Sequence, residues 1–480
     1  MISCSAFDCR RLLERNAQIL SNVPSGPTSA WHAYTNVGPQ PWKPTHFIGV
    51  KHAPQWMEKY SERELEMNNP QQLLQEREKR IQDATALKKT DQVPIACMWD
   101  FFPAKWKGVT VKEVMYNPQL MFDLWVECME HFKPDQGDNP YALRGFGRVL
   151  DILDFQHLKW AGHGVGENQS YQFVELEAMK ADEYDHFLFD PSDFMVRRFW
   201  PRVYKAFAPF EKLPPLNQVI SYFWGLYNGV FLLSPEMEEA RTAMIEAGKA
   251  SAELLKWMTA YGKKMAELGF PPSSGGYSQV PFDTLGDVFR GTKGVMMDLY
   301  RRPDKVMAAC EKLLPIMIDS AIASVKRSGV PRVFIPLHKG LDGFLSPQQF
   351  NKFYWPHMKE LLEALIREGI TPWVLAEGVC NTRLDAFRDV TPGKVIYHFE
   401  GTDMFKAKEM MRDRCCIRGN VPASVLAVGT PDDVRSYCKK LLDVCAPDGG
   451  FIMDASCPLA EAKPENVQAM YDFTREYTGN

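Results

Sequence analysis

The 480-residue chain is slightly acidic, with a formal net charge of -4 and an isoelectric point near 6.2. It therefore lacks the basic excess of a dedicated nucleic-acid-binding protein, and its 45% hydrophobic and 24% charged residues are typical of a globular protein with a large core. The N-terminus mixes acidic and basic residues, and no stretch approaches the ~20 apolar residues of a membrane-spanning helix. We expect a soluble, cytoplasmic protein that binds neither nucleic acid nor membranes.

The first 85 residues are predicted to be N-terminal helices and an extended arm. A short helical start precedes a segment rich in proline and aromatic residues, at 33–55, which has no clean period and offers a route to a homodimer. A polar helical stretch follows. The next segment, VPIACMWD, is an apolar run that suits a strand covered on both faces.

From residue 86 onward, segments with helical periodicity alternate with short apolar runs. The strand candidates include PRVFIPLHKG, TPWVLAEG, GKVIYHFEGTD, DRCCIRGNVP and DGGFIMDASCP, each of which follows an amphipathic helical stretch. This alternation predicts an α/β fold with a parallel sheet, closed into a single (β/α)8 barrel of the TIM type over residues 86–480. The region 150–230 is richer in glycine, aromatic and acidic residues and is predicted to be an inserted lid.

Polar side chains follow the apolar runs, where a barrel of this type places its active site. They are Asp100 and Lys105, His338 and Lys339, Glu377 and Cys380, His398 with Glu400 and Asp403, Arg418 and Asn420, and Asp454 with Cys457. Glu377 stands out because a carboxylate at the end of a buried strand needs a partner. It is either a structural partner of Arg383 or Arg418, or it binds a positively charged group.

Several segments together resemble the uroporphyrinogen decarboxylase superfamily. They include PFDTLGDVFRG, GLDGFLSPQQFNKFYWPHMKELLEAL, CIRGNVPASVLAVGTPDDV and GGFIMDASCPLAEAKPENVQAMYDF, and the similarity covers roughly residues 85–478. The resemblance implies a single (β/α)8 barrel. The superfamily includes the decarboxylase of haem synthesis and zinc-dependent methyltransferases, which move a methyl group between a corrinoid protein and a thiol or other acceptor.

Two motifs indicate which branch of the superfamily the chain resembles more. The first predicted strand leads into MWDFFPAKWKG, whereas the true decarboxylase has an arginine-rich motif there that binds porphyrinogen carboxylates. Cys457, in DASCPL, lies where the methyltransferases carry one zinc ligand. Their other two ligands come from an H-x-C motif; here the segment reads EGVCNT, so Glu377 takes the place of the histidine and Cys380 is displaced by one position.

The resemblance therefore implies a zinc site formed by Glu377, Cys380 and Cys457, which would leave a fourth position open for chemistry. Such a metal ion would lower the pKa of a bound thiol or phenol, or activate a methyl ether. No D-x-H-x-x-G segment of the corrinoid-ligating kind occurs; the nearest, around His157, has the wrong spacing. Any cobalamin is therefore expected on a separate partner protein. Cys380 and Cys457 are alternatively buried structural thiols.

The remaining site residues are predicted from their positions at strand ends. We expect catalytic roles for Asp100, His338 and His398, and substrate contacts from Trp99, Lys105, Tyr277, Arg290, Lys339 and Asn420. Trp99 is alternatively a core residue, and Arg290 alternatively pairs with Asp283 or Asp287.

Three functions remain open at this point. The leading hypothesis is a zinc-dependent methyltransferase that moves a methyl group between a corrinoid protein and a small thiol, phenol or methoxylated substrate. The second is a metal-independent decarboxylase of a non-porphyrin acid, with Asp100 or His338 as proton donor and Arg290 or Lys339 holding the carboxylate. The third is a non-catalytic barrel that binds a ligand or a partner protein.

Overall fold

The computed structural model describes residues 69–142, 144–217, 223 and 230–479. These residues belong to one compact unit, Arg63–Asn480. The predicted N-terminal arm at 33–55, with its role in a homodimer, lies outside the described residues. No helix in the described ranges is long and apolar enough to cross a membrane.

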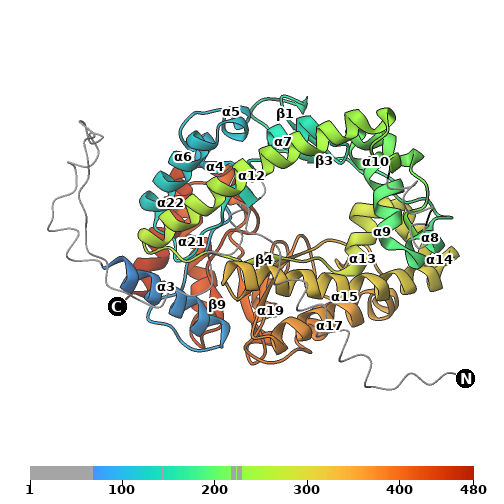
Figure 1. Ribbon diagram of the computed structural model, residues 1–480. Coiled ribbons are helices and arrows are strands. Elements are labelled where there is room, and N and C mark those ends of the chain that lie inside the picture. Colours follow the sequence, from blue (N-terminus) through green and yellow to red (C-terminus); the bar gives the residue numbers. More distant parts are fainter. Residues whose placement is uncertain (1–68, 143, 218–222, 224–229, 480) are drawn as a thin grey trace, which may run out of the picture. The chain divides into compact units, whose positions relative to one another are not determined.

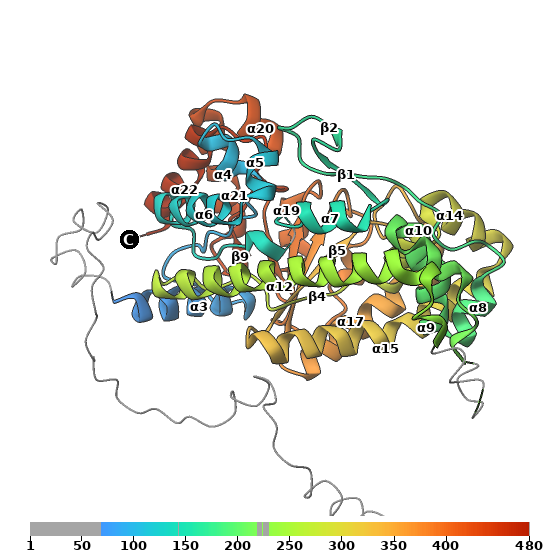
Figure 2. The ribbon, with the colours of Figure 1, turned by 45° about the horizontal axis from the view of Figure 1, so that its top comes forward.

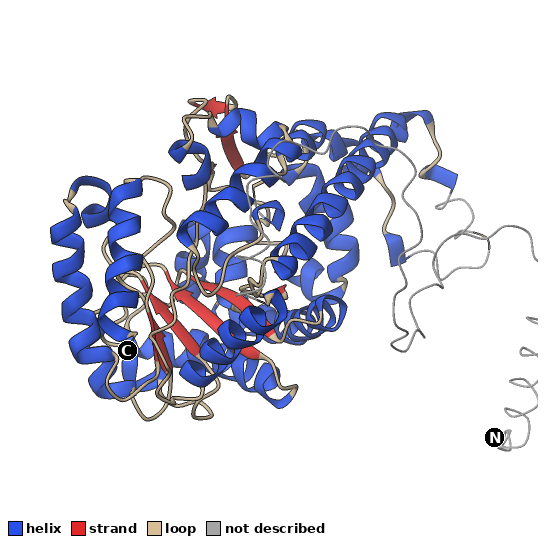
Figure 3. Cartoon of the chain, turned by 90° about the vertical axis from the view of Figure 1, so that its left-hand side faces the viewer, coloured by secondary structure: helices blue, strands red, loops and turns tan. Residues whose placement is uncertain are grey.

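The centre of the fold is a parallel sheet (Figure 3). Its six strands follow one another in sequence order. The strands are β4 (Gly276–Tyr277), β5 (Arg332–Leu337), β6 (Thr371–Ala376), β7 (Ile396–Phe399), β8 (Cys416–Arg418) and β9 (Phe451–Ile452). Two short segments complete the circuit through isolated parallel bridges, which pair Ile95 with Met453, Ala96 with Gln136 and Gly137 with Pro272. The described chain thus pairs as a ring of eight parallel segments, and the predicted (β/α)8 barrel is confirmed.

Helices follow the strands and surround the ring (Figure 1). They are α4 (Phe102–Trp106), α5 (Val111–Tyr116) and α6 (Pro118–Phe132) after the first segment; α13 (Pro281–Thr284), η7 (Leu285–Phe289), α14 (Gly291–Arg301) and α15 (Pro303–Ser328) after β4; α16 (Pro347–Gln349), η8 (Phe350–Tyr354) and α17 (Trp355–Arg367) after β5; then α18 (Leu384–Phe387), α19 (Met404–Met411), α20 (Ala423–Val428), α21 (Pro431–Cys445) and α22 (Pro464–Thr478).

Local sequence explains where several of these helices begin and end. The stretch 111–132 has one continuous helical period, but Asn117 caps a new helix and Pro118 begins it, so the chain forms two helices. Thr430 and Asp433 form a capping box at the start of α21. The helix α15 ends where Gly329 adopts a left-handed conformation.

A long insertion separates the second and third strand segments of the barrel. It contains η2 (Pro140–Ala142), α7 (Gly147–Leu153), β1 (Leu158–Ala161), β2 (Gly164–Val165), β3 (Gln172–Phe173), α8 (Tyr184–Phe189), α9 (Pro191–Phe194), η3 (Met195–Phe199), α10 (Trp200–Val203), η4 (Lys205–Lys212), η6 (Pro235–Met237) and α12 (Glu238–Glu267). The strands β1 to β3 form a small separate sheet. The 30-residue helix α12 runs along one side of the barrel (Figure 2).

The interior of the barrel is a small apolar cluster, distinct from the larger core between the sheet and its helices. Its members include Ala96, Met98, Trp373, Leu375, Ile396, Cys416 and Ile452, with Phe334 packed against them. Ile81 and Ala84 of helix α3 (Pro70–Thr85) join this cluster, and Glu78 of the same helix pairs with Arg332 at the start of β5. The helix α3 therefore covers the N-terminal end of the barrel and leaves the C-terminal end for a site.

Candidate functional site

The C-terminal strand ends carry a ring of polar side chains, which we call the barrel mouth. Side chains alternate along a strand, so steps of two from the interior residues identify the positions that face the mouth. On the strands that contribute to the interior cluster these are Asp100, His338, Glu377, Glu400 and Asn420, while Asp138 and Tyr277 lie on the two remaining segments of the ring. Most of them are charged, unlike the apolar cluster beneath.

His338 is held between two carboxylates. Its Nδ1 lies 2.6 Å from Oδ2 of Asp287, and its Nε2 lies 3.3 Å from Oε1 of Glu377. Burial alone would lower the pKa of His338, but its hydrogen bonds to these two carboxylates raise the pKa to about 10. The ring is therefore a cation at neutral pH, with one N–H directed to each carboxylate.

Asp287 gathers three donors at the edge of the mouth. Its second oxygen, Oδ1, lies 2.8 Å from Nζ of Lys339, and Gln279 donates to Oδ2 over 2.6 Å. Burial opposes ionisation of Asp287, but the hydrogen bond and positive charge of His338, together with Lys339, lower its pKa. The carboxylate is thus ionised, and it fixes the side chains of both residues that follow β5.

The opposite side of the mouth holds a buried arginine between two aspartates. Nε of Arg144 donates to Asp100 over 3.1 Å and Nη1 donates to Asp138 over 2.7 Å. Arg144 is 3% exposed. The predicted catalytic residue Asp100 is therefore bound by a guanidinium.

His398 and the pair of Arg418 with Asp454 lie just beneath the mouth. His398 is fully buried, its Nε2 lies 2.8 Å from the carbonyl oxygen of Ala455, and its ring stacks on Trp373. Burial lowers the pKa of His398 to about 4, so the ring is neutral. Nε of Arg418 donates to Asp454 over 2.7 Å in the same layer.

Glu377, Glu400 and Cys457 influence one another electrostatically. Burial and the charge of Glu377 raise the pKa of Glu400. Burial, followed by the charge of Glu400, raises the pKa of the Cys457 thiol. Both shifts favour the protonated form of the group concerned.

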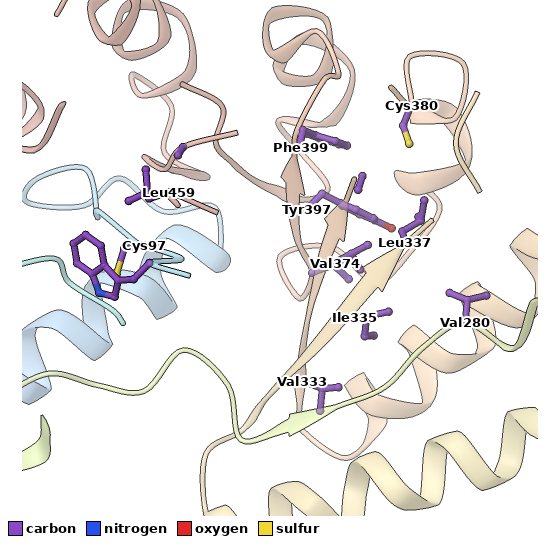
Figure 4. Close-up of a cluster of buried hydrophobic side chains, with 14 of the residues drawn as sticks. Cys97, Val280, Val333, Ile335, Leu337, Val374, Cys380, Tyr397, Phe399 and Leu459 are labelled. Atoms are coloured by element: carbon purple, nitrogen blue, oxygen red, sulfur yellow. The ribbon is translucent and has the colours of Figure 1, made fainter. Parts of the chain in front are cut away.

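The three residues that the resemblance implies as zinc ligands do not form a metal-binding group. No cluster of three or more histidine, cysteine, aspartate or glutamate side chains suited to a metal ion occurs in the described ranges. Cys380 is fully buried in the apolar cluster that includes Leu337 and Tyr397 (Figure 4), and burial raises the pKa of its thiol. Glu377 is bound to His338 instead. The donor set does not fit zinc, so no chemical step is derived through it.

Other predicted site residues lie outside the mouth or serve its framework. Trp99 is fully buried and stacks on Phe102 in the core. Lys105 pairs with Glu461 beside a surface cavity of about 340 Å³. Arg290 is buried and bound by Asp298, Glu177 and the carbonyl oxygen of Met179.

Asn420 and Tyr277 both lie at strand ends but differ in exposure. The amide of Asn420 donates to the carbonyl oxygens of Glu400 and Thr402, so it fixes the loop after β7. Tyr277 is half-exposed, and its ring packs against Phe334. Of the predicted substrate-binding residues, Tyr277, Lys339 and Asn420 therefore lie at the mouth, where the amide of Asn420 is bound to the backbone.

Sequence reasoning missed the two aspartates that organise this site. Asp283 and Asp287 appeared only as alternative partners of Arg290, yet both bind the residues after β5. Their spacing of four residues in PFDTLGD, directly after the β4 segment, places both on one side of a helical turn. That spacing is a signal that could have identified them.

The comparisons with known proteins agree with the barrel. The sequence profile of the family described as uroporphyrinogen decarboxylase (URO-D) matches residues 273–477, which contain strands β4 to β9. Residues 273–477 are therefore similar to the uroporphyrinogen decarboxylase family. The first two strand segments of the barrel precede this match, so Asp100, Asp138 and Arg144 lie outside it.

Curated relatives of this domain are distant. The uroporphyrinogen decarboxylase of Chlorobium phaeobacteroides is 25% identical over 183 residues, which cover 37% of this chain and 51% of the relative. That of Pseudoalteromonas translucida is 23% identical over 197 residues. The chain spans about half the length of the curated relatives it matches.

One solved structure resembles nearly the whole barrel. A methyltransferase from Methanosarcina mazei superposes with a TM-score of 0.51 at 16% identity, and the match covers 83% of this chain and 98% of that one. At this identity the likeness concerns the fold. The match therefore supports the (β/α)8 barrel, and both the relatives and the structural neighbour are named as enzymes.

Proposed function

We propose that this protein is a methyltransferase whose reaction takes place at the barrel mouth, with a neutral or cationic methyl compound as donor. The observation that carries the proposal is the charge balance of the mouth. Among the described residues, the cations of the mouth are already bound by carboxylates: Arg144 by Asp100 and Asp138, His338 by Asp287 and Glu377, and Lys339 by Asp287. Arg418, just beneath the mouth, is bound by Asp454. Glu400 adds a further carboxyl group, whose pKa is raised by burial and by Glu377.

This balance disfavours an anionic substrate. A carboxylate that enters the mouth would have to displace an existing carboxylate from its cation, and it would meet the repulsion of Glu377. A methyl group that departs as an incipient cation gains from the same negative field. The charge balance therefore favours methyl transfer over decarboxylation of an acid.

His338 supplies the proton that the leaving group needs. In the proposed step the bond from the methyl carbon to oxygen, nitrogen or sulfur breaks, its electron pair stays on the heteroatom, and that atom takes the Nε2 proton of His338. A lone pair of the methyl acceptor forms the new bond to carbon. The pKa of about 10 for His338 lies near the ~10 of a phenol, so the proton transfer is nearly balanced.

The proposed methyl acceptor is a reduced corrinoid carried by a separate protein. This assignment is supported by the family of the domain and by the methyltransferase fold, and it assigns no residue of this chain to the corrinoid. Asp287 orients the imidazolium from behind, and Glu377 lies on the side from which the substrate approaches. The part played by this chain is to bind the methyl donor, hold the proton and exclude competing anions.

The test supplies cob(I)alamin as acceptor and a panel of donors: methoxyarenes, methylated amines and methyl thioethers. Methylcobalamin is followed by its absorbance. We expect turnover with at least one donor and its loss in His338→Gln, with Lys312→Gln on the outer helix α15 as a matched control. Absence of methylcobalamin with every donor, together with CO2 release from a panel of carboxylic acids, would overturn the proposal.

Decarboxylation remains the second candidate because the family domain and the curated relatives carry that name. His338 would then protonate the carbanion left by CO2, and Lys339 would hold the substrate carboxylate after leaving Asp287. The panel of acids in the same experiment decides between the two reactions. A protein inactive in both assays would favour the binding barrel.

A further inference from the structure

Asp283 lies directly behind the turn that carries His338 and Lys339. It is fully buried on α13, which follows β4. Its Oδ1 accepts a hydrogen bond from the backbone N–H of Lys339 over 2.6 Å, and its Oδ2 accepts one from the backbone N–H of His338 over 3.2 Å. A single carboxylate thus binds two successive peptide groups at the end of β5.

Tyr354 binds the same carboxylate of Asp283. Its hydroxyl donates to Oδ2 of Asp283 over 2.5 Å, and the tyrosine is fully buried. It is the last residue of η8, a π-helical turn, and Asp287 lies in another π-helical turn, η7. Such turns add one residue to a helix and recur at functional sites. One of them brings Asp287 to His338 and Lys339, and the other brings Tyr354 to Asp283.

The other hydrogen bonds at this turn involve side chains. Asp287 binds the ring of His338 and the amine of Lys339, whereas Asp283 binds their backbone. The direction of a side chain follows from the backbone that bears it. The ring of His338 therefore reaches Glu377 only while the peptide groups of 338 and 339 keep their orientation.

We infer that Asp283 and Tyr354 are positioning residues that fix the backbone of His338 and Lys339 and so direct the His338 ring toward Glu377. Neither side chain reaches the mouth, because both are fully buried. The inference rests on the proposed function in one respect, namely that His338 is the proton donor whose direction matters.

The chain contains a matched pair elsewhere. Asp298 is 1% exposed and accepts a hydrogen bond from the hydroxyl of Tyr184 over 3.0 Å, and Tyr184 is also 1% exposed. Asp298 binds Arg290 rather than the turn after β5. Tyr354→Phe and Tyr184→Phe therefore each remove a buried hydroxyl from a buried carboxylate, but only the first removes it beside His338.

The experiment uses full-length protein labelled with 13C at the histidine rings. The chain has ten histidines, and the signal missing in His338→Gln identifies His338. We expect Tyr354→Phe to shift this signal and Tyr184→Phe to leave it unchanged, while thermal unfolding shows that both variants are folded. With an active methyl donor, Tyr354→Phe should lower kcat, up to roughly 10²-fold for a misplaced donor, with little change in KM.

The two possible failures are distinguishable. If no methyl donor is found, the ring signal still decides whether Tyr354 positions His338, because it requires no turnover. An unchanged His338 signal in both Tyr354→Phe and Asp283→Asn, with both proteins folded, would overturn the inference. Asp298→Asn serves as the control for the carboxylate, and an equal shift of the His338 signal in that variant would also overturn it.

Discussion

The carboxylate of Glu377 lies 3.3 Å from Nε2 of His338, so an ion pair at the barrel mouth joins the ends of the neighbouring strands β5 and β6. The other ring nitrogen of His338 is bound by Asp287. A carboxylate at the end of a buried strand needs a cationic partner. For Glu377 this partner is His338. The alternative partners considered from the sequence, Arg383 and Arg418, bind other groups.

The first prediction concerns the pKa of His338. In Glu377→Gln the ring keeps Asp287 but loses its second carboxylate, so its pKa should fall below the value of about 10. Because the folded-state pKa exceeds the ~6.5 of an unfolded histidine, the stabilisation from this group is complete below pH 6.5 and is lost as the pH rises toward 10. Titration of the ring 13C signal measures the change.

Glu400→Gln is the matched control for this prediction. Glu400 lies at the end of the neighbouring strand β7 and has no ion pair with His338 in the described part of the chain. The pKa of His338 should therefore change less in Glu400→Gln than in Glu377→Gln. Equal shifts in the two variants would show that the general charge of the mouth, rather than the ion pair, raises the pKa.

A second prediction concerns Asp283 and acid stability. Burial raises the pKa of Asp283 to about 6, above the ~3.9 of an unfolded aspartate. The folded state therefore binds this proton more tightly, and the stabilisation is complete below about pH 4 and is lost as the pH rises through 6. In Asp283→Asn this contribution should vanish, as urea unfolding at several pH values between 4 and 7 can measure. Parallel pH profiles for wild type and variant would contradict it.

The third prediction concerns thiol reactivity. Of the nine cysteines in the described residues, eight are buried and Cys457 is partly exposed. Although burial raises the pKa of Cys457, access should decide the order of reaction. We expect an alkylating reagent to modify Cys457 first among these nine, as shown by peptide mass spectrometry, with Cys457→Ser as control. Faster modification of Cys380 would contradict its placement in the core.

The barrel could be predicted from the sequence because its signals are local and repeated. Runs such as TPWVLAEG and PRVFIPLHKG are short, apolar and separated by amphipathic helices, and both form strands of the ring. The first two segments of the ring pair through isolated bridges. Of these two segments, only VPIACMWD was predicted as a strand. The second segment, around Gln136 and Gly137, is too short to carry a periodic signal.

The site could be predicted only in part, because local sequence does not determine which side chains distant in the chain will pair. His338, Lys339 and Glu377 were identified from their positions at strand ends, a rule that any barrel obeys. Whether Cys380 faces the mouth or the core depends on the course of the loop after β6, and a displacement of one residue decides it. The role of Asp283 depends on where α13 meets the end of β5.

The last prediction tests the ion pair beneath the mouth. The side chains of Arg418 and Asp454 are each 1% exposed, and the guanidinium also lies 4.1 Å from the ring centroid of Trp373. Asp454→Ala leaves a buried arginine without its carboxylate, which should reduce the free energy of unfolding by about 3–5 kcal/mol. Replacement of both residues, as Arg418→Met with Asp454→Leu, should recover much of that loss because no charge is then buried.

Asp432→Ala, in an exposed pair with Arg435, is the control and should change stability little. A loss in Asp454→Ala no larger than that of the control would show that Arg418 finds another partner in the barrel.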